Sequence, residues 1–100
     1  MNTQNDLYLK PRHLAMLQQI LKMHLPDCEV WAYGSRVKGT AHDGSDLDLV
    51  VHGVKDKISF QNCVDSLKNS TLPMLIDIHN WEDLPVEFQH NIKKKYVILD

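Results

Sequence analysis

The first residues whose types and spacing suggest chemistry are two aspartates, Asp46 and Asp48, separated by one leucine. They fall in a leucine- and valine-rich stretch that predicts a β-strand over residues 46–52, and residues two apart on a strand project from the same face. Their Cβ atoms would lie ~7 Å apart, a separation that one divalent cation can bridge. Aspartate is uncommon inside strands, and two like charges on one face repel each other unless a cation lies between them. A solvated edge strand with its polar residues outward is the alternative explanation.

A third carboxylate interrupts another apolar stretch, Leu75-Ile76-Asp77-Ile78. This stretch predicts a strand over residues 74–79, in which Asp77 would be costly to bury without a partner, although a solvent-facing position would also accommodate it. If this strand lies beside strand 46–52, the three carboxylates form a cluster of hard oxygen ligands that suits two Mg²⁺ ions. His79 shares the predicted face of Asp77, where it could act on that carboxylate or on a metal.

The turn at Gly34-Ser35 predicts an anion-binding site. It ends an aromatic and β-branched stretch, residues 28–33, that predicts a strand, and such a turn exposes backbone N–H groups and the serine hydroxyl. Arg36 and Lys38 would add positive charge nearby. By itself this is the composition of an ordinary turn. Combined with the three carboxylates, however, it predicts metal-assisted in-line attack on the α-phosphate of a nucleotide, with pyrophosphate as the leaving group.

The rest of the pattern places these residues on one small sheet. Apolar residues at helical spacing predict a helix over residues 11–25 and another that Ser59 caps and that ends near Asn69. A last helix, capped by Asn80 or Asp83, is expected to end near Lys95, and the conformation of residues 96–99 is left open. We therefore predict one α/β or α+β domain over residues 1–100, with a small β-sheet flanked by helices.

Composition narrows the classes of function. The 100 residues carry 11 Lys and Arg and 13 Asp and Glu, a formal net charge of −2 that disfavours general binding to nucleic acid or anionic lipid. No apolar run approaches the ~18 residues of a membrane span, and the N-terminus lacks a signal-peptide pattern. Cys28 and Cys63 lack metal-site spacing, which favours two small buried thiols in a reducing cytoplasm. The histidines lack zinc-site spacing and, His79 aside, are expected to be exposed.

The composite pattern of Gly34-Ser35, ten residues, and Asp46-Leu47-Asp48 resembles the signature of the DNA polymerase β-like nucleotidyltransferase superfamily, in particular its minimal members, the MNT proteins. The resemblance implies a polymerase β-like fold with a mixed sheet. It also implies that Gly34 and Ser35 hold the β- and γ-phosphates of the nucleotide. Arg36 would support the phosphates or the turn. Lys38 would contact phosphate at a position where many relatives carry arginine, whose bidentate fork lysine lacks.

The same resemblance assigns the three aspartates. Asp46 and Asp48 would bind both Mg²⁺ ions, while Asp77 would complete the second metal site and help to deprotonate the acceptor. Proteins of this type are typically found with a HEPN-domain toxin, an RNase, which they can neutralise by transferring AMP from ATP to a tyrosine hydroxyl. The resemblance thus implies a cytoplasmic, Mg²⁺-dependent adenylyltransferase that acts as an antitoxin. A partner would supply the acceptor to so short a chain.

Two alternatives remain open from the sequence. The first is an antitoxin that blocks its HEPN partner by binding alone, with an idle nucleotide site, although retention of all three carboxylates argues against a decayed site. The second is a nucleotidyltransferase for a small hydroxylated molecule such as an aminoglycoside. The sequence shows no acceptor pocket and no element that would read the base.

Overall fold

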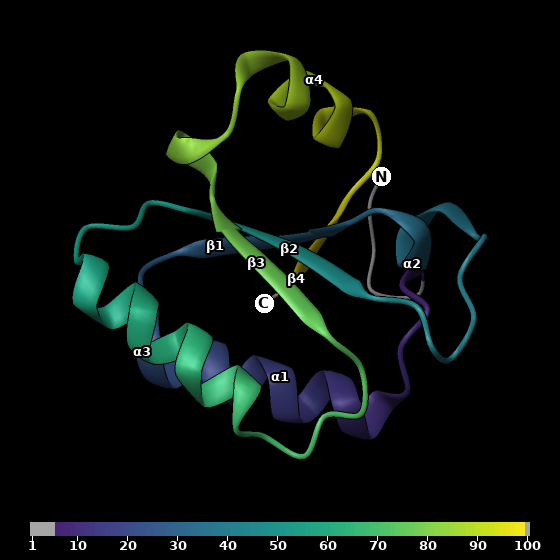
Figure 1. The fold of residues 1–100 in the computed structure, drawn as a ribbon, viewed down its shortest axis with the longest axis horizontal. Coiled ribbons are helices and arrows are strands. Elements are labelled where there is room, and N and C mark those ends of the chain that lie inside the picture. Colours follow the sequence, from purple (N-terminus) through teal and green to yellow (C-terminus); the bar gives the residue numbers. More distant parts are fainter. Residues whose placement is uncertain (1–5, 100) are drawn as a thin grey trace.

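Four strands form one mixed sheet in the computed structural model, which describes residues 6–99 (Figure 1). Their order is β3-β2-β1-β4, where β1 is Glu29–Tyr33, β2 is Leu47–His52, β3 is Ile76–Asn80 and β4 is Val97–Leu99. β1 runs antiparallel to β2 and β4, and β2 runs parallel to β3. The expected α/β class is confirmed, and β3 lies beside β2, as the three-carboxylate hypothesis requires.

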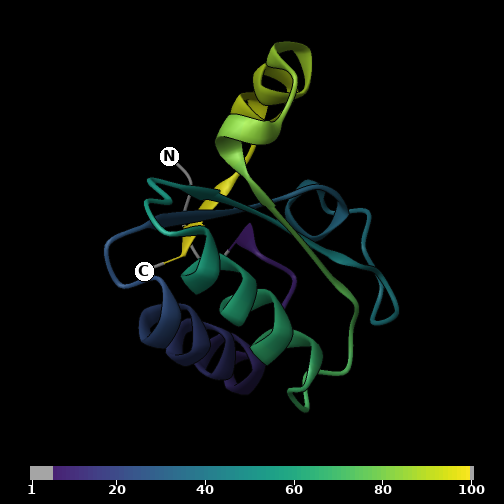
Figure 2. The ribbon, with the colours of Figure 1, turned by 60° about the vertical axis from the view of Figure 1, so that its left-hand side comes forward.

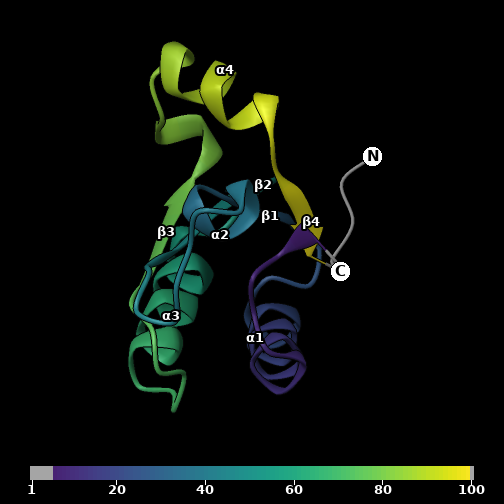
Figure 3. The ribbon, with the colours of Figure 1, turned by 90° about the vertical axis from the view of Figure 1, so that its right-hand side faces the viewer.

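Helices cover both faces of this sheet. α1 (Pro11–His24) and α3 (Lys57–Lys68) pack side by side on one face, whereas α4 (Val86–Lys94) lies on the other (Figure 2). The short α2 (Ser35–Lys38) follows β1 and lies at one end of the sheet, between these two layers (Figure 3). No helix within residues 6–99 is long and apolar enough to cross a membrane.

Strand alternation separates a fully apolar face of the sheet from a face that also carries aspartates. On β2, Leu47, Leu49 and Val51 are fully buried in the core formed with α1 and α3. The intervening residues of β2 therefore point toward α4. There Val50 packs with Tyr33 of β1 and Ile92 of α4 in a smaller second core. Because β3 pairs with β2 in parallel register, Asp48 and Asp77 occupy neighbouring positions on this second face.

Several element boundaries differ from the predicted ones. α3 begins two residues before Ser59 because Asp56 is the cap: its carboxylate accepts hydrogen bonds from the Ile58 N–H and the Ser59 hydroxyl, both at 2.9 Å. The last helix is divided. Asn80 caps a 3-10 turn, η2 (Trp81–Asp83), and α4 starts only after Pro85. Residues 97–99 become a strand because β1 has a free edge with which to pair.

Both cysteines are free thiols. Cys63 is buried under the sheet, and burial raises its pKa to about 11, so it is protonated and unreactive at neutral pH. Cys28 is only half-buried, and its thiol donates to the Gly53 carbonyl at 3.4 Å. The expectation of two small packed thiols is thus confirmed for Cys63 and met in part for Cys28.

An aromatic cluster attaches α4 and η2 to the sheet. The Trp31 ring stacks on Tyr96 with centroids 3.9 Å apart, and His52 lies 4.0 Å from Trp31 and 4.4 Å from Trp81. The expectation that His52 is an exposed imidazole is therefore wrong. Its Nε2 is buried and has no hydrogen-bond partner among residues 6–99. Burial lowers the pKa of His52, an effect that Glu29 partly opposes.

This environment predicts a pH-dependent loss of stability. Below about pH 6.5 the unfolded chain protonates His52 while the folded chain resists protonation, so stability is retained above that pH and falls as the pH decreases through this window. We expect urea unfolding midpoints to fall between about pH 7.5 and about pH 5.5, and to fall less in His52→Phe, which keeps an aromatic ring without the titration. Parallel pH profiles for the two proteins would contradict this assignment.

Candidate active site

The site begins at the turn between β1 and α2. Gly34 has a φ of +83° and a ψ of −155°, a region that is essentially restricted to glycine. A Cβ built on this glycine would overlap the Asp48 Oδ2 atom. The chain therefore needs glycine here for two reasons, the backbone conformation and the close approach of a carboxylate to the turn. Ser35 follows as the first residue of α2, whose leading N–H groups have no acceptor within the helix.

The carboxylates lie next to this turn. Asp48 faces Tyr33 across the β1–β2 ladder and Asp77 across the β2–β3 ladder. Asp46 is exposed and comes one residue before β2 begins. The pKa of Asp48 is raised, first by burial and then by the negative charges of Asp77 and Asp46, while His79 opposes the shift. Asp46 and Asp77 are thus close enough to Asp48 to raise the pKa of its carboxyl.

Two further side chains border the carboxylates. His79 Nε2 lies 3.0 Å from Asp77 Oδ1, so the contact expected from their shared face is present. Burial, with Asp48 and Asp77, raises the pKa of the Tyr33 phenol to about 12. Tyr33 therefore stays neutral at neutral pH. The sequence identified Tyr33 only as a strand residue, because an aromatic at the end of a strand is usual in any sheet.

The chain as folded does not present a complete metal site. Within residues 6–99 no three His, Cys, Asp or Glu side chains come together closely enough to hold one metal ion, so the three-carboxylate metal site stays a prediction. The Asp77 carboxylate contacts His79. The donor set nevertheless fits Mg²⁺: it consists of carboxylate oxygens, and the raised pKa of Asp48 marks a site where a cation would relieve negative charge.

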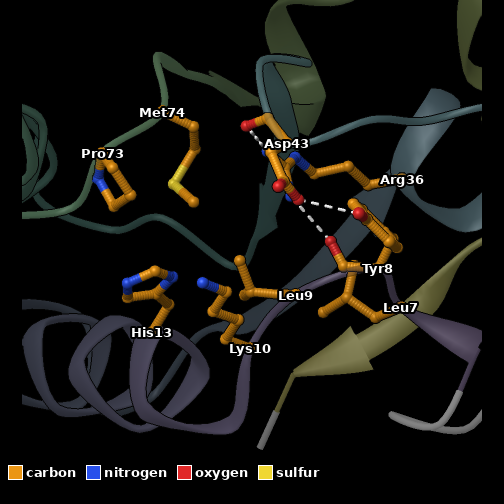
Figure 4. Close-up of a pocket in the computed structure, with 9 residues that line it drawn as sticks. All are labelled: Leu7, Tyr8, Leu9, Lys10, His13, Arg36, Asp43, Pro73 and Met74. Carbon is orange, nitrogen blue, oxygen red and sulfur yellow. Dashed lines mark hydrogen bonds between the residues drawn. The ribbon is translucent and has the colours of Figure 1, made fainter.

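Arg36 is turned away from this site. The residue is only 3% exposed, and its guanidinium donates to the backbone carbonyls of Tyr8 (2.7 Å) and Asp43 (3.1 Å), which Figure 4 shows beside it. It also donates to the Ser45 carbonyl (2.8 and 3.0 Å). These contacts hold the N-terminal segment and the loop that leads into Asp46. Of the two roles suggested by the resemblance, support of the turn or of the phosphates, these contacts favour the turn.

A cavity of about 270 Å³ lies over the carboxylates. Its lining includes four of the predicted site residues, Gly34, Lys38, Asp48 and Asp77. It also includes Tyr33 and four residues that the sequence analysis had not assigned to the site, from α4 and its C-cap: Phe88, Asn91, Ile92 and Lys95. Their spacing is that of an ordinary amphipathic helix, so only the fold reveals that this face of α4 covers the site.

A larger cavity, about 470 Å³, lies on another part of the surface, between the N-terminal segment, α1 and the loop before β3 (Figure 4). Leucine, proline and methionine side chains supply much of its lining. Its one carboxylate, Asp43, already accepts a hydrogen bond of 2.7 Å from the Tyr8 hydroxyl. This cavity lacks the clustered carboxylates of the smaller one, so size alone does not identify the site of chemistry.

A glycine turn, carboxylates on two adjacent strands and a covering helix define a nucleotidyltransferase. Residues 16–100 match the family described as "Polymerase beta, Nucleotidyltransferase", and the chain belongs to that family. It is 35% identical over 96 residues to a probable protein adenylyltransferase, MntA, from Haemophilus influenzae, a match covering 94% of this chain and 84% of that one.

Two solved structures share the fold. A crystal structure of a toxin-antitoxin with AMP-PNP matches with a TM-score of 0.71 at 20% identity, over 87% of this chain and 72% of that chain. A crystal structure from Shewanella oneidensis matches with a TM-score of 0.67 at 15% identity, over 92% of this chain and 72% of that chain. The family match confirms the predicted polymerase β-like fold, and these two structures share the fold of this chain.

The contact between Gly34 and Asp48 predicts the result of adding a methyl group. Gly34→Ala should destabilise the protein by about 3 kcal/mol, because both the backbone region and the Asp48 carboxylate exclude it. Gly39→Ala is the control: Gly39 also has a positive φ, +82°, but a Cβ there would meet nothing within 4 Å, so a loss of about 1 kcal/mol is expected. Urea unfolding measures both. If the losses in the free energy of unfolding from Gly34→Ala and Asp48→Ala simply add in the double variant, the Asp48 carboxylate does not contribute to the cost of the added methyl group.

The Arg36 contacts predict that a substitution that keeps the positive charge will still destabilise the protein. Arg36→Lys should cost roughly 2 to 4 kcal/mol, because an ammonium cannot reproduce the guanidinium contacts to carbonyls in three places. Arg12→Lys, at an exposed position on α1, should be nearly neutral. Thermal and urea unfolding test the pair. Unchanged stability of Arg36→Lys, combined with weaker binding of tripolyphosphate, would instead assign Arg36 to the phosphates.

Proposed function

We propose that this chain is a Mg²⁺-dependent protein adenylyltransferase that acts as the antitoxin of a HEPN-domain toxin, by transferring AMP from ATP to a tyrosine hydroxyl of that toxin. The observation that carries the proposal is the approach of Asp48 to the Gly34 turn, opposite Asp77 on the next strand. This arrangement puts carboxylate ligands next to backbone N–H groups suited to phosphate.

The relatives support the biological setting. The similar Haemophilus protein is described as a probable protein adenylyltransferase, which supports a protein acceptor. The toxin-antitoxin structure with AMP-PNP, an ATP analogue, supports both a toxin partner and an adenine nucleotide. The HEPN identity of the partner, the tyrosine acceptor and a cytoplasmic location rest on the MNT resemblance of the motif.

The reaction we propose is a single in-line displacement. The acceptor oxygen forms a bond to the α-phosphorus of ATP, the bond from that phosphorus to the oxygen bridging to the β-phosphate breaks, and pyrophosphate leaves with the electron pair. Asp77 accepts the hydroxyl proton, held in place by the adjacent His79. Gly34 and Ser35 present N–H groups to the β- and γ-phosphates, and Lys38 adds positive charge beside them.

The metal ligands in this proposal are Asp46, Asp48 and Asp77. When bound there, Mg²⁺ would neutralise phosphate charge and lower the pKa of a coordinated hydroxyl. Asp46 and Asp77 are exposed enough to reorient toward a cation, and Asp48 is fixed by the turn and by its strand. The two outer carboxylates would therefore adjust around the central one.

Transfer of label tests this function directly. The chain is coexpressed with the product of the adjacent gene, and the purified pair is incubated with Mg²⁺ and ATP labelled at the α- or the γ-phosphate. We expect α-label, and no γ-label, on a tyrosine of the partner. Asp48→Asn should reduce the rate by a factor on the order of 100 or more, equivalent to ~2.7 kcal/mol of transition-state stabilisation. Asp27→Asn, at an exposed turn, should leave it unchanged.

Other outcomes separate the alternatives. Neutralisation of the toxin that persists in Asp48→Asn, with no label on the partner, would replace the proposal with inhibition by binding alone. Label found only on an added aminoglycoside would replace the protein acceptor with a small hydroxylated molecule. Label from the γ-phosphate would identify a phosphoryl transfer and overturn AMP transfer.

A further inference from the structure

One face of α4 lies over the catalytic cavity and has no role in the proposed chemistry. Phe88, Asn91 and Ile92 recur at positions i, i+3 and i+4, which share one side of a helix, and they line the cavity of about 270 Å³ together with Lys95, the C-cap residue of α4. Ile92 is buried against the sheet and anchors this face. The other three add a ring, an amide and an ammonium group to the lining of the cavity that also contains Asp48 and Asp77.

We propose that this face of α4 is the nucleoside-binding wall of the site, on which Phe88 stacks against the base, Asn91 hydrogen-bonds the edge of the base and Lys95 contacts the polyphosphate. The inference rests on the proposed function, whose phosphate and metal ligands are all on the sheet side of the same cavity. It supplies the base-reading element that the sequence did not show.

Phe88 has the exposure and position of a stacking platform. It is 40% exposed although it belongs to the cavity lining, and large apolar side chains are more often buried. Its ring meets Tyr33 nearly at right angles, with centroids 5.9 Å apart and an interplanar angle of 85°. Tyr33 directly precedes Gly34, so a base against Phe88 would lie within reach of phosphates at the turn. Aromatic side chains bind bases by stacking of this kind.

The other two side chains supply what a nucleotide needs besides stacking. Asn91 is exposed, and its amide can donate and accept at once, as the edge of a purine requires. Lys95 comes from the C-terminal end of α4, which lies on the same side of the molecule as α2 in Figure 1, and it lines the cavity together with Lys38. The two lysines thus add positive charge to a cavity that contains Asp48 and Asp77. The helix rise of about 1.5 Å per residue separates Phe88 from Lys94, the last residue of α4, by ~9 Å, and Lys95 follows it, so base and phosphates can occupy different parts of one wall.

The size of the cavity favours a nucleotide that is only partly enclosed. Ligand pockets usually measure roughly 300–1,000 Å³, and this one is slightly smaller, at about 270 Å³. A nucleoside triphosphate would therefore remain accessible from one side. Such access is what a protein acceptor needs, since its hydroxyl must reach the α-phosphate while the base stays on α4.

Paired binding measurements test this wall. Calorimetry with the full chain and Mg²⁺ compares ATP with inorganic tripolyphosphate, which lacks the nucleoside. Phe88→Ala should weaken ATP binding about tenfold or more and leave tripolyphosphate unaffected, because only ATP has a base to stack. Lys95→Gln should weaken both ligands, and Asn91→Ala should reduce the preference for ATP over GTP. Phe88→Trp should retain ATP binding.

Controls on the same helix keep the result specific. Val86 is exposed but does not line the cavity, and Lys94 neighbours Lys95 without lining it, so Val86→Ala and Lys94→Gln should bind both ligands like the wild type. Unfolding midpoints confirm that each variant is folded. Unchanged ATP affinity in folded Phe88→Ala would overturn the inference, as would a loss of toxin binding in place of ATP binding.

Failure of the proposed function is distinguishable from failure of this inference. If the wild type transfers no AMP to its partner but ATP binding still depends on Phe88, the nucleoside wall stands and the proposed transfer is wrong. If AMP transfer proceeds in wild type and Phe88→Ala with the same ATP dependence, the transfer stands and the wall is wrong.

Discussion

The Arg36 guanidinium is the contact on which the geometry of the site depends. A cation that is 3% exposed is costly to remove from water, and here the cost is offset by hydrogen bonds to carbonyls at three separate positions. Arg36 belongs to α2, and Gly34 is the N-cap of that helix. Its hydrogen bonds to the Ser45 carbonyl therefore fix the loop before Asp46 relative to the Gly34 turn. The approach of Asp48 to the Gly34 turn is therefore supported by an arginine that does not line the cavity over the carboxylates.

The sheet assigns different tasks to its two faces, and period-two alternation enforces the division. Leu47, Leu49 and Val51 need an apolar cover, which α1 and α3 supply. The opposite face alternates between Asp48, which must reach a ligand, and Val50, which must be buried. A helix packed along the whole of that face would exclude substrate. The aromatic cluster around Trp31 resolves this conflict, because it fastens η2 and the end of α4 at one side and leaves the carboxylate end open.

Sequence patterns predicted those features that depend on local spacing. Residue composition and alternation located β1, β2 and β3, and the anomaly of acids in apolar strands indicated Asp46, Asp48 and Asp77. Features that depend on distant partners were missed. Residues 97–99 form a strand only because β1 offers an edge, and Arg36 is buried only because the chain returns past it at Tyr8 and Ser45. The cap at Asp56 in place of Ser59 was a choice between two good caps that only the three-dimensional structure decides.

The same reasoning explains why the proposed nucleoside-binding wall is not visible in the sequence while the candidate catalytic carboxylates are conspicuous. An aspartate in an apolar strand violates a local preference, so it attracts attention without any knowledge of the fold. Phe88, Asn91 and Lys95 violate nothing, since a phenylalanine, an amide and a terminal lysine are ordinary on an amphipathic helix. Their proposed role follows only from the fold, because Ile92 packs α4 against the second core and the neighbouring residues then line the cavity that contains Asp48. Residues that perform bond-making chemistry need unusual local environments, whereas residues that select the ligand need only the right position.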